Sequence, residues 1–108
     1  MNPRDFETYA EQALQDLSRR LMKAGDEYGF EADFQAGALI VEFEEPPAKF
    51  VVSSNSPVSQ IWISANVKSQ KLDWDVALGA FCNKATGETL VEVMAGAISE
   101  HLGENVKL

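Results

Sequence analysis

The chain has 108 residues, of which 45% are hydrophobic and 24% are charged, so we expect a single domain over residues 1–108 with one hydrophobic core. Its 17 Asp and Glu against 9 Lys and Arg give a net charge of -8, which repels the phosphates of nucleic acids and anionic membrane surfaces. The same charge attracts cations and basic protein surfaces, although acidity alone more often serves solubility.

The sequence carries no recognisable targeting or membrane-spanning segment. No apolar run reaches the roughly 18 residues that a membrane helix needs, and the N-terminus resembles neither a signal peptide nor a transit peptide. The single cysteine, Cys82, excludes an internal disulfide, which fits a reducing compartment. We therefore expect a cytoplasmic protein, or a mitochondrial matrix protein if the chain is a processed eukaryotic form.

The first segment is predicted to be a helix. Apolar residues recur at three- and four-residue spacing, which gives one apolar stripe on a helical period. Asn2 followed by Pro3 is typical of a helix start, and Gly25 is typical of a helix end. We expect the helix to run from about Pro3 to Ala24.

A run of strands is predicted for the middle of the chain. Apolar and polar residues alternate there, and glycines and prolines mark the turns between the alternating stretches. The expected strands cover residues 30–35, 39–43, 49–53, 60–64, 72–75 and 80–83. The first two should form a hairpin across the turn at Ala36 and Gly37.

The last segment is again predicted to be helical. One apolar stripe runs from Leu90 to Leu102, Thr89 and Glu92 have the spacing of a capping box, and Gly103 ends the helix. Because the strands follow one another without intervening helices, the sheet should be an antiparallel meander. We predict an α+β fold, a two-layer sandwich whose N- and C-terminal helices pack on one face of a five- to six-stranded antiparallel sheet. The other face is then solvated or a binding surface.

Residues that usually carry enzymatic or tight metal chemistry are scarce. Cys82 lies in an apolar context and is expected to be a small buried side chain. His101 is expected to be a solvated residue at the helix end, and Trp74 is expected to lie in the core. With one Cys and one His, the sequence has no Cys/His cluster of zinc spacing, so we expect no tight, closed metal site. No nucleophile or phosphate-loop motif is present, so we expect no enzyme.

Several stretches of the sequence resemble the frataxin family, bacterial and mitochondrial members alike. The most specific is residues 55–64, Asn-Ser-Pro-Val-Ser-Gln-Ile-Trp-Ile-Ser, with a proline followed by Gln-Ile-Trp-Ile. Residues 72–75, 87–90 and 34–39 are similar to the next strand, the start of the second helix and the first hairpin of that family. The resemblance covers the whole chain and implies the same fold, two helices on an antiparallel sheet.

The resemblance also implies weak, exchangeable iron binding at an acidic ridge on the first helix and first strand. Carboxylate oxygens suit Fe2+ and Fe3+, although from the residues alone such carboxylates are more often a solvated polar face. Arg19 and Lys23 stand where family members often have acids, and their charge repels iron, so we expect fewer or weaker iron sites than a typical member has. The candidate iron ligands are Glu7, Glu11, Asp26, Glu27, Glu31 and Asp33.

Trp62 is the candidate centre of a partner-binding surface. By alternation, Ile61 and Ile63 point one way and Trp62 the other, so isoleucines that face the helices would leave Trp62 on the open face. From the residues alone, a Trp62 covered by neighbours such as Val51 or Leu72 is an equal alternative. The resemblance favours exposure and contact with a scaffold protein. The other candidate partner-binding residues are Gln60, Ser53, Asn55 and Lys71.

The resemblance implies an accessory protein of iron–sulfur cluster assembly, an iron donor or regulator that docks on a complex of cysteine desulfurase and scaffold protein. A net charge of -8 suits a basic desulfurase surface. One alternative is ferroxidase-type iron oxidation and storage. Another is a small acidic interaction module such as a secretion chaperone, which would be dimeric and indifferent to iron. We expect a monomer, and oligomerisation with iron stays open.

Overall fold

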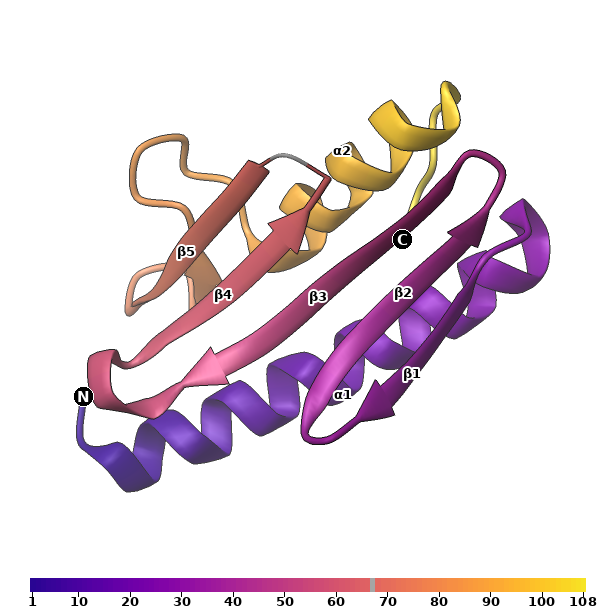
Figure 1. Ribbon diagram of the computed structural model, residues 1–108. Coiled ribbons are helices and arrows are strands. Elements are labelled where there is room, and N and C mark those ends of the chain that lie inside the picture. Colours follow the sequence, from indigo (N-terminus) through magenta and orange to yellow (C-terminus); the bar gives the residue numbers. More distant parts are fainter. Residues whose placement is uncertain (67) are drawn as a thin grey trace.

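The structure is a computed structural model that describes residues 1–66 and 68–108 (Figure 1). Within these residues, the helices α1 (Pro3–Tyr28) and α2 (Leu90–Leu102) lie at the two ends of the chain. Between them come β1 (Glu31–Gln35), β2 (Ala38–Glu44), β3 (Pro47–Asn55), the short 3-10 helix η1 (Ser56–Val58), β4 (Gln60–Ala65), β5 (Lys68–Asp75) and β6 (Ala80–Cys82). Strands that are neighbours in the sequence are neighbours in the sheet, and every pair is antiparallel.

Both helices lie on the same face of the sheet, so the molecule has two layers and one open sheet face (Figure 1). Alternate residues of the strands point toward the helices and pack on their apolar stripes. The largest fully buried side chains are Phe6, Leu17, Leu21, Leu39, Val41, Phe50, Val52, Ile61, Leu72, Phe81, Met94 and Ile98. The predicted α+β two-layer fold is confirmed. In the described part of the chain, no helix is long and apolar enough to span a membrane.

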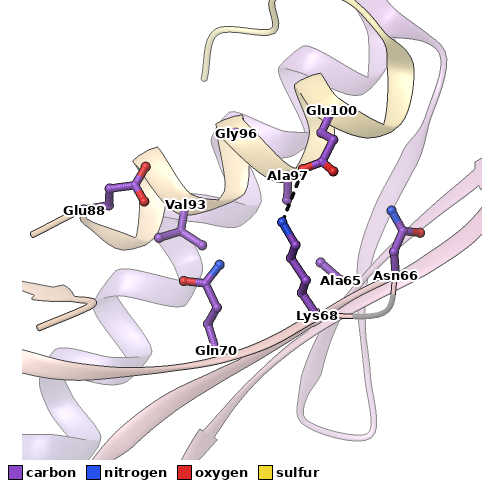
Figure 2. Close-up of a pocket in the computed structure, with 9 residues that line it drawn as sticks. All are labelled: Ala65, Asn66, Lys68, Gln70, Glu88, Val93, Gly96, Ala97 and Glu100. Carbon is purple, nitrogen blue, oxygen red and sulfur yellow. Dashed lines mark ion pairs between the residues drawn. The ribbon is translucent and has the colours of Figure 1, made fainter. Parts of the chain in front are cut away.

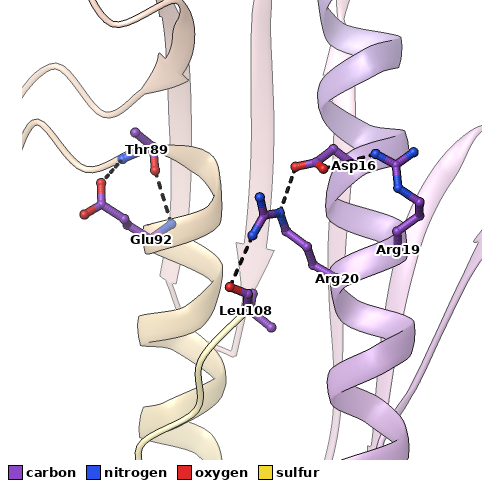
Figure 3. A network of polar contacts seen from close by, with 6 residues as sticks. All are labelled: Asp16, Arg19, Arg20, Thr89, Glu92 and Leu108. Atoms are coloured by element: carbon purple, nitrogen blue, oxygen red, sulfur yellow. Dashed lines mark hydrogen bonds and ion pairs between the residues drawn. The ribbon is translucent and has the colours of Figure 1, made fainter.

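Both helices begin with the caps that the sequence predicts. At the start of α1, the Asn2 side chain accepts a hydrogen bond from the backbone N–H of Asp5 (2.8 Å). At the start of α2, the Thr89 hydroxyl accepts from the N–H of Glu92 (3.4 Å), and the Glu92 carboxylate accepts from the N–H of Thr89 (3.0 Å) (Figure 3). These bonds satisfy N–H groups that have no helical partner. The backbone bond from Thr89 also holds the pKa of Glu92 below its usual value.

The predicted end of the first helix, Ala24 before Gly25, is wrong. Gly25 is buried inside α1, which continues to Tyr28 and is capped by Gly29, whose φ of 84° is in the left-handed region. Gly25 is a glycine for another reason, because a Cβ added there would lie 2.3 Å from the carbonyl oxygen of Phe30. The chain that leaves the helix packs directly on Gly25, whose carbonyl accepts from the N–H of Gly29 (2.8 Å).

β5 begins at Lys68, earlier than the predicted strand of residues 72–75. Residues 68–71 are Lys-Ser-Gln-Lys, which lack the apolar alternation of a half-buried strand. They nevertheless pair with β4, where Gln70 lies opposite Ile63. Pairing with a neighbouring strand therefore extends β5 into a segment whose own sequence does not favour a strand.

A hollow remains between α2 and the first half of β5 (Figure 2). Gly96 and Ala97 line it on the helix side, and the Lys68 ammonium reaches across to the Glu100 carboxylate at 3.9 Å. The space beside Gly96 is open, because no atom would lie within 4 Å of a Cβ added there. Gly25 of α1 is therefore tightly packed, whereas Gly96 of α2 faces open space.

The segment after α2 packs back on both helices. Val106 is 3% exposed, and its backbone N–H donates to the hydroxyl of Ser99 (2.9 Å). The Arg20 guanidinium of α1 donates to the backbone oxygen of Leu108 (3.2 Å) and to the carboxylate of Asp16 (2.8 Å) (Figure 3). The hydrogen bond from Arg20 is the main reason that the pKa of Asp16 is lowered.

A methyl group added at Gly25 and at Gly96 is expected to change stability in opposite directions. Gly25→Ala brings a Cβ against the Phe30 carbonyl and should lower the free energy of unfolding by about 2 kcal/mol. Gly96→Ala meets open space and should raise it by about 0.5 to 1 kcal/mol through helix propensity. Urea unfolding measures both variants. Changes of the same sign in the free energy of unfolding of the two variants would contradict the close contact at Gly25.

Asp16→Asn is expected to lower stability at neutral pH but not in acid. The folded-state pKa of Asp16 lies below its unfolded value. Its carboxylate therefore stabilises the fold above the unfolded pKa, and this contribution is lost as the pH falls through the lowered folded pKa. The urea midpoints of wild type and variant should differ at pH 7 and converge as the pH falls below the lowered folded-state pKa of Asp16. A pH-independent difference would show that the charge of Asp16 is not responsible.

Candidate functional site: an acidic edge and an open sheet face

The six carboxylates predicted to hold iron are exposed, and five of them line two hollows, neither of which is lined by Glu27. Asp26, Glu31 and Asp33 line one hollow, where the end of α1 meets the start of β1. Glu7 and Glu11 line another hollow nearer the start of α1. Along the axis of α1, the fifteen steps from Glu11 to Asp26 rise roughly 22 Å, whereas β1 returns toward Glu11, and Phe34, next to Asp33, lines the hollow of Glu7 and Glu11. The six residues are Glu7, Glu11, Asp26, Glu27, Glu31 and Asp33.

Two further carboxylates, which the sequence reasoning missed, extend the group at the end of α1. Glu42 and Glu44 of β2 line a hollow together with Asp26 and Glu31. Glu42 lies directly opposite Glu31 in the pairing of β1 with β2. The signal is present in the sequence, because Glu42 and Glu44 alternate with core residues just as Glu31 and Asp33 do. We call the six predicted carboxylates together with Glu42 and Glu44 the acidic edge.

The acidic edge is open to solvent and is not a preassembled metal site. Within residues 1–66 and 68–108, no three His, Cys, Asp or Glu side chains are grouped so that they could hold a metal ion. The Gln35 amide donates to Asp33 (3.0 Å) and to Glu42 (3.4 Å), which keeps these two carboxylates near each other. Exposed carboxylates on flexible side chains attract hard cations by charge and exchange them with water.

The cations predicted to interrupt the acidic ridge, Arg19 and Lys23, stand between its two groups along α1. Both side chains are exposed. The Arg19 guanidinium lies 3.2 Å from a carboxylate oxygen of Asp16, so an acid of the same helix offsets part of its charge. This basic stretch reinforces the separation of the acidic edge into two groups.

The five residues predicted to bind a partner come together on the open face of the sheet. Trp62 is 37% exposed, whereas Ile61 and Ile63 are 0% and 2% exposed in the core. Ser53 of β3 and Lys71 of β5 lie directly opposite Trp62, one on each side. The remaining two residues form another pair of β3 with β4. We call the set of Ser53, Asn55, Gln60, Trp62 and Lys71 the Trp62 surface.

Polar contacts surround the indole of Trp62. Its Nε1–H donates to Gln60 Oε1 (3.0 Å), and Gln60 Nε2 donates to Oδ1 of Asp73 on β5 (3.1 Å). The Lys71 ammonium lies over the indole ring at 5.0 Å from its centroid, a cation–π distance. The sequence reasoning missed Asp73, because only the register of β4 against β5 brings it opposite Gln60.

Two single residues lie close to where the sequence predicts them. Cys82 is 2% exposed, as its apolar context predicts. Trp74 is half-buried rather than fully in the core: its ring packs edge-on against Phe81 (centroids 5.1 Å apart) and stacks on Tyr9 (4.5 Å). Tyr9 is itself 38% exposed, so the outer side of this aromatic pair reaches solvent.

His101 lies in the last turn of α2, as predicted, but it is half-buried rather than solvated. The imidazole is half-buried and lies 4.5 Å from the Phe43 ring and 5.7 Å from the Phe50 ring, centroid to centroid. Its Nε2 donates to the carbonyl oxygen of Pro46 at 2.8 Å. His101 therefore joins the end of α2 to the turn between β2 and β3.

These features define a class of protein, a small acidic two-layer α+β domain with an uncovered sheet face, a surface tryptophan and an edge of carboxylates. The family model of the frataxin-like domain matches residues 1–104. The iron–sulfur cluster assembly protein CyaY of Thioalkalivibrio sulfidiphilus is 27% identical over 103 residues, which cover 95% of each chain. The CyaY of Pseudomonas fluorescens is 30% identical over 105 residues, which cover 94% of this chain and 87% of that one.

A solved structure shares the fold. Frataxin from Psychromonas ingrahamii superposes with a TM-score of 0.76 at 22% identity, over 99% of this chain and 97% of that one. The chain belongs to the frataxin family, and the resemblance seen in its sequence is confirmed.

Anaerobic titration of the 15N-labelled protein with Fe2+ is expected to broaden amide signals in two separate stretches. These are residues 26–33 with 42–44, and residues 7–11, because a paramagnetic ion broadens the nuclei near its binding site. Glu31→Gln combined with Glu42→Gln should remove the broadening in the first stretch and leave the second.

The matched control is Glu88→Gln combined with Glu104→Gln, which removes the same charge elsewhere on the surface and should leave both stretches broadened. Signals that stay sharp at several equivalents of Fe2+ would contradict iron binding at the acidic edge.

Proposed function

We propose that this protein is an iron-binding accessory factor of iron–sulfur cluster assembly that acts as a cytoplasmic monomer. It docks on a complex of cysteine desulfurase and scaffold protein, and it holds iron weakly as cargo or signal. Its relatives are named as iron–sulfur cluster assembly proteins. The docking proposal rests on one observation: Trp62 is exposed on the uncovered face of the sheet.

The Trp62 surface has the composition of a protein-binding site. Tryptophan is enriched at interface hot spots, because it buries a large area and loses few rotatable bonds on binding. Trp62 lies on β4, inside the sheet, and is still more than a third exposed at 37%. Ser53, Asn55 and Lys71 beside it supply the polar rim that surrounds such anchors. This surface is the part of the molecule that contacts the scaffold protein.

The acidic edge suits a second partner of opposite charge. The chain carries a net charge of -8, and a basic desulfurase surface is complementary to it. Such complementarity speeds association and sets orientation more than it adds affinity. The edge follows α1, β1 and β2, and the Trp62 surface lies on β3, β4 and β5 (Figure 1). One molecule can therefore contact desulfurase and scaffold together.

The protein acts on the rate of cluster assembly and is not a self-sufficient catalyst. Exposed carboxylates release a hard cation as readily as they take it up, which fits delivery or sensing of iron. Ferroxidase-type oxidation needs carboxylates arranged to favour Fe3+ over Fe2+. On α1, Glu11 and Asp26 lie roughly 22 Å apart along the helix axis. Carboxylates at this distance cannot share one iron ion, so they offer less support for the ferroxidase alternative.

Trp62→Ala is expected to weaken binding to the desulfurase–scaffold complex of the same genome by about thirtyfold, the loss of one hot-spot anchor. Leu78→Ala is the matched control, because Leu78 is an exposed apolar residue (55%) of the β5–β6 loop, outside the Trp62 surface. It should leave the affinity unchanged. Isothermal titration calorimetry measures both affinities, and circular dichroism verifies the fold. Wild-type affinity of Trp62→Ala would refute docking through this surface.

A further inference from the structure

Three side chains form one chain of hydrogen bonds across β4 and β5 on the open face. The indole N–H of Trp62 donates to Gln60 (3.0 Å), and the Gln60 amide donates to Asp73 (3.1 Å). Gln60 and Asp73 lie directly opposite each other in the register of these strands. Both are half-buried, so these bonds are partly shielded from water and worth more than fully exposed ones.

The chemistry of its two ends allows only one direction for this chain. A carboxylate at neutral pH only accepts hydrogen bonds, and an indole N–H only donates them. Gln60 has one donating and one accepting end, so it satisfies both neighbours only when its NH2 group faces Asp73 and its Oε1 faces Trp62. The negative charge of Asp73 thus selects the orientation of the amide, and the amide in turn selects the position of the indole.

A second contact restrains the same indole from another side. Lys71, directly opposite Trp62 on β5, places its ammonium over the ring at 5.0 Å from the centroid. The ring is therefore held by its N–H edge and by one face, while 37% of the residue stays exposed. A side chain already held in its bound orientation loses less conformational entropy when a partner binds.

We propose that Asp73 is a positioning residue for docking, which acts through Gln60 to hold the Trp62 indole in the orientation that the scaffold protein receives. The proposal rests on the docking function proposed above for the Trp62 surface. Asp73 itself lies outside that surface and needs no contact with the partner.

Exchange of the donor and the acceptor between positions 60 and 73 tests this role. In Gln60→Glu, two carboxylates oppose each other and the chain is broken; in Asp73→Leu, the amide loses its acceptor. In the double variant Gln60→Glu with Asp73→Asn, the new amide donates to Glu and the other Glu oxygen accepts from the indole N–H. The double variant has the wild-type net charge and restores the chain: the amide at position 73 now donates to the carboxylate at position 60, and the indole N–H donates to position 60 as before.

The first measurement is the solvent exchange of the Trp62 indole N–H in the free 15N-labelled protein. The chain has two tryptophans, so the indole signal of Trp74 serves as internal reference. Exchange should be about fivefold faster in Gln60→Glu and in Asp73→Leu, and near the wild-type rate in the double variant. The control Glu104→Gln removes one exposed negative charge elsewhere and should change nothing.

The second measurement is the affinity for the desulfurase–scaffold complex by calorimetry. The two single variants should bind about fivefold more weakly, and the double variant should bind more tightly than Gln60→Glu alone, because both carry the same change in the Trp62 surface. A purely structural role of Asp73 would lower thermal stability without this gain in affinity. Unchanged indole exchange in both single variants, or a double variant with restored exchange that binds no better than Gln60→Glu, would overturn the positioning role.

Comparison with Trp62→Ala separates the two proposals. If Trp62→Ala weakens binding and the variants at Gln60 and Asp73 do not, docking stands and positioning is refuted. If Trp62→Ala also binds like wild type, docking through the Trp62 surface is refuted and this proposal falls with it.

Discussion

The packing of both helices on one face of the sheet is the constraint on which the rest of the structure depends. Every strand must send alternate residues toward the helices, so Ile61 and Ile63 enter the core and Trp62 takes the open face. A slip of one residue in the register of β4 would exchange these positions, exposing two isoleucines and burying an indole. The register that builds the core is therefore also the register that presents Trp62.

The open face is stabilised by its own side chains, because no helix covers it. Ile40 of β2 alternates with core residues and yet is only 6% exposed, opposite Val51 of β3. Further along the same face, Lys71 covers one side of Trp62, and Gln60 binds its N–H. Cross-strand pairs of this kind contribute about 0.2 to 1 kcal/mol each. Polar contacts thus fix the tryptophan in place while leaving it accessible to a partner.

The parts of the molecule that the sequence predicts are those decided within a few residues. Asn2 and Thr89 cap helices by bonding N–H groups three positions away, and alternation places Trp62 on the face of the sheet opposite to Ile61 and Ile63. Features decided by distant segments were missed. The sequence predicts a helix end at Gly25, because it does not show that the chain leaving α1 packs on this residue. It predicts a solvated His101, because it does not show that the β2–β3 turn lies beside the imidazole.

In the candidate site, too, features decided by neighbouring residues were predicted, and features decided by distant segments were not. The carboxylates on α1 and β1 can be found in the sequence, because helical spacing and strand alternation place each on an exposed face. Glu42 joins Glu31, and Asp73 joins Gln60, only through the pairing of one strand with the next. Sequence reasoning that considers each strand alone has no access to such pairs, even where each member shows the expected alternation.

The negative charges of the acidic edge repel one another, which lowers the stability of the folded sheet, and they attract cations. Glu31 and Glu42 are directly opposite in an antiparallel pair, an arrangement that destabilises a sheet, and Lys49 on the other side of Glu42 offsets only part of it. A cation held between the two carboxylates, as we propose for iron, would relieve this repulsion and so stabilise the folded state. β1 is also an edge strand, where charged side chains prevent pairing with a second chain. The same carboxylates therefore protect the edge of the sheet without a cation, and in the function proposed above they are the residues that bind iron weakly.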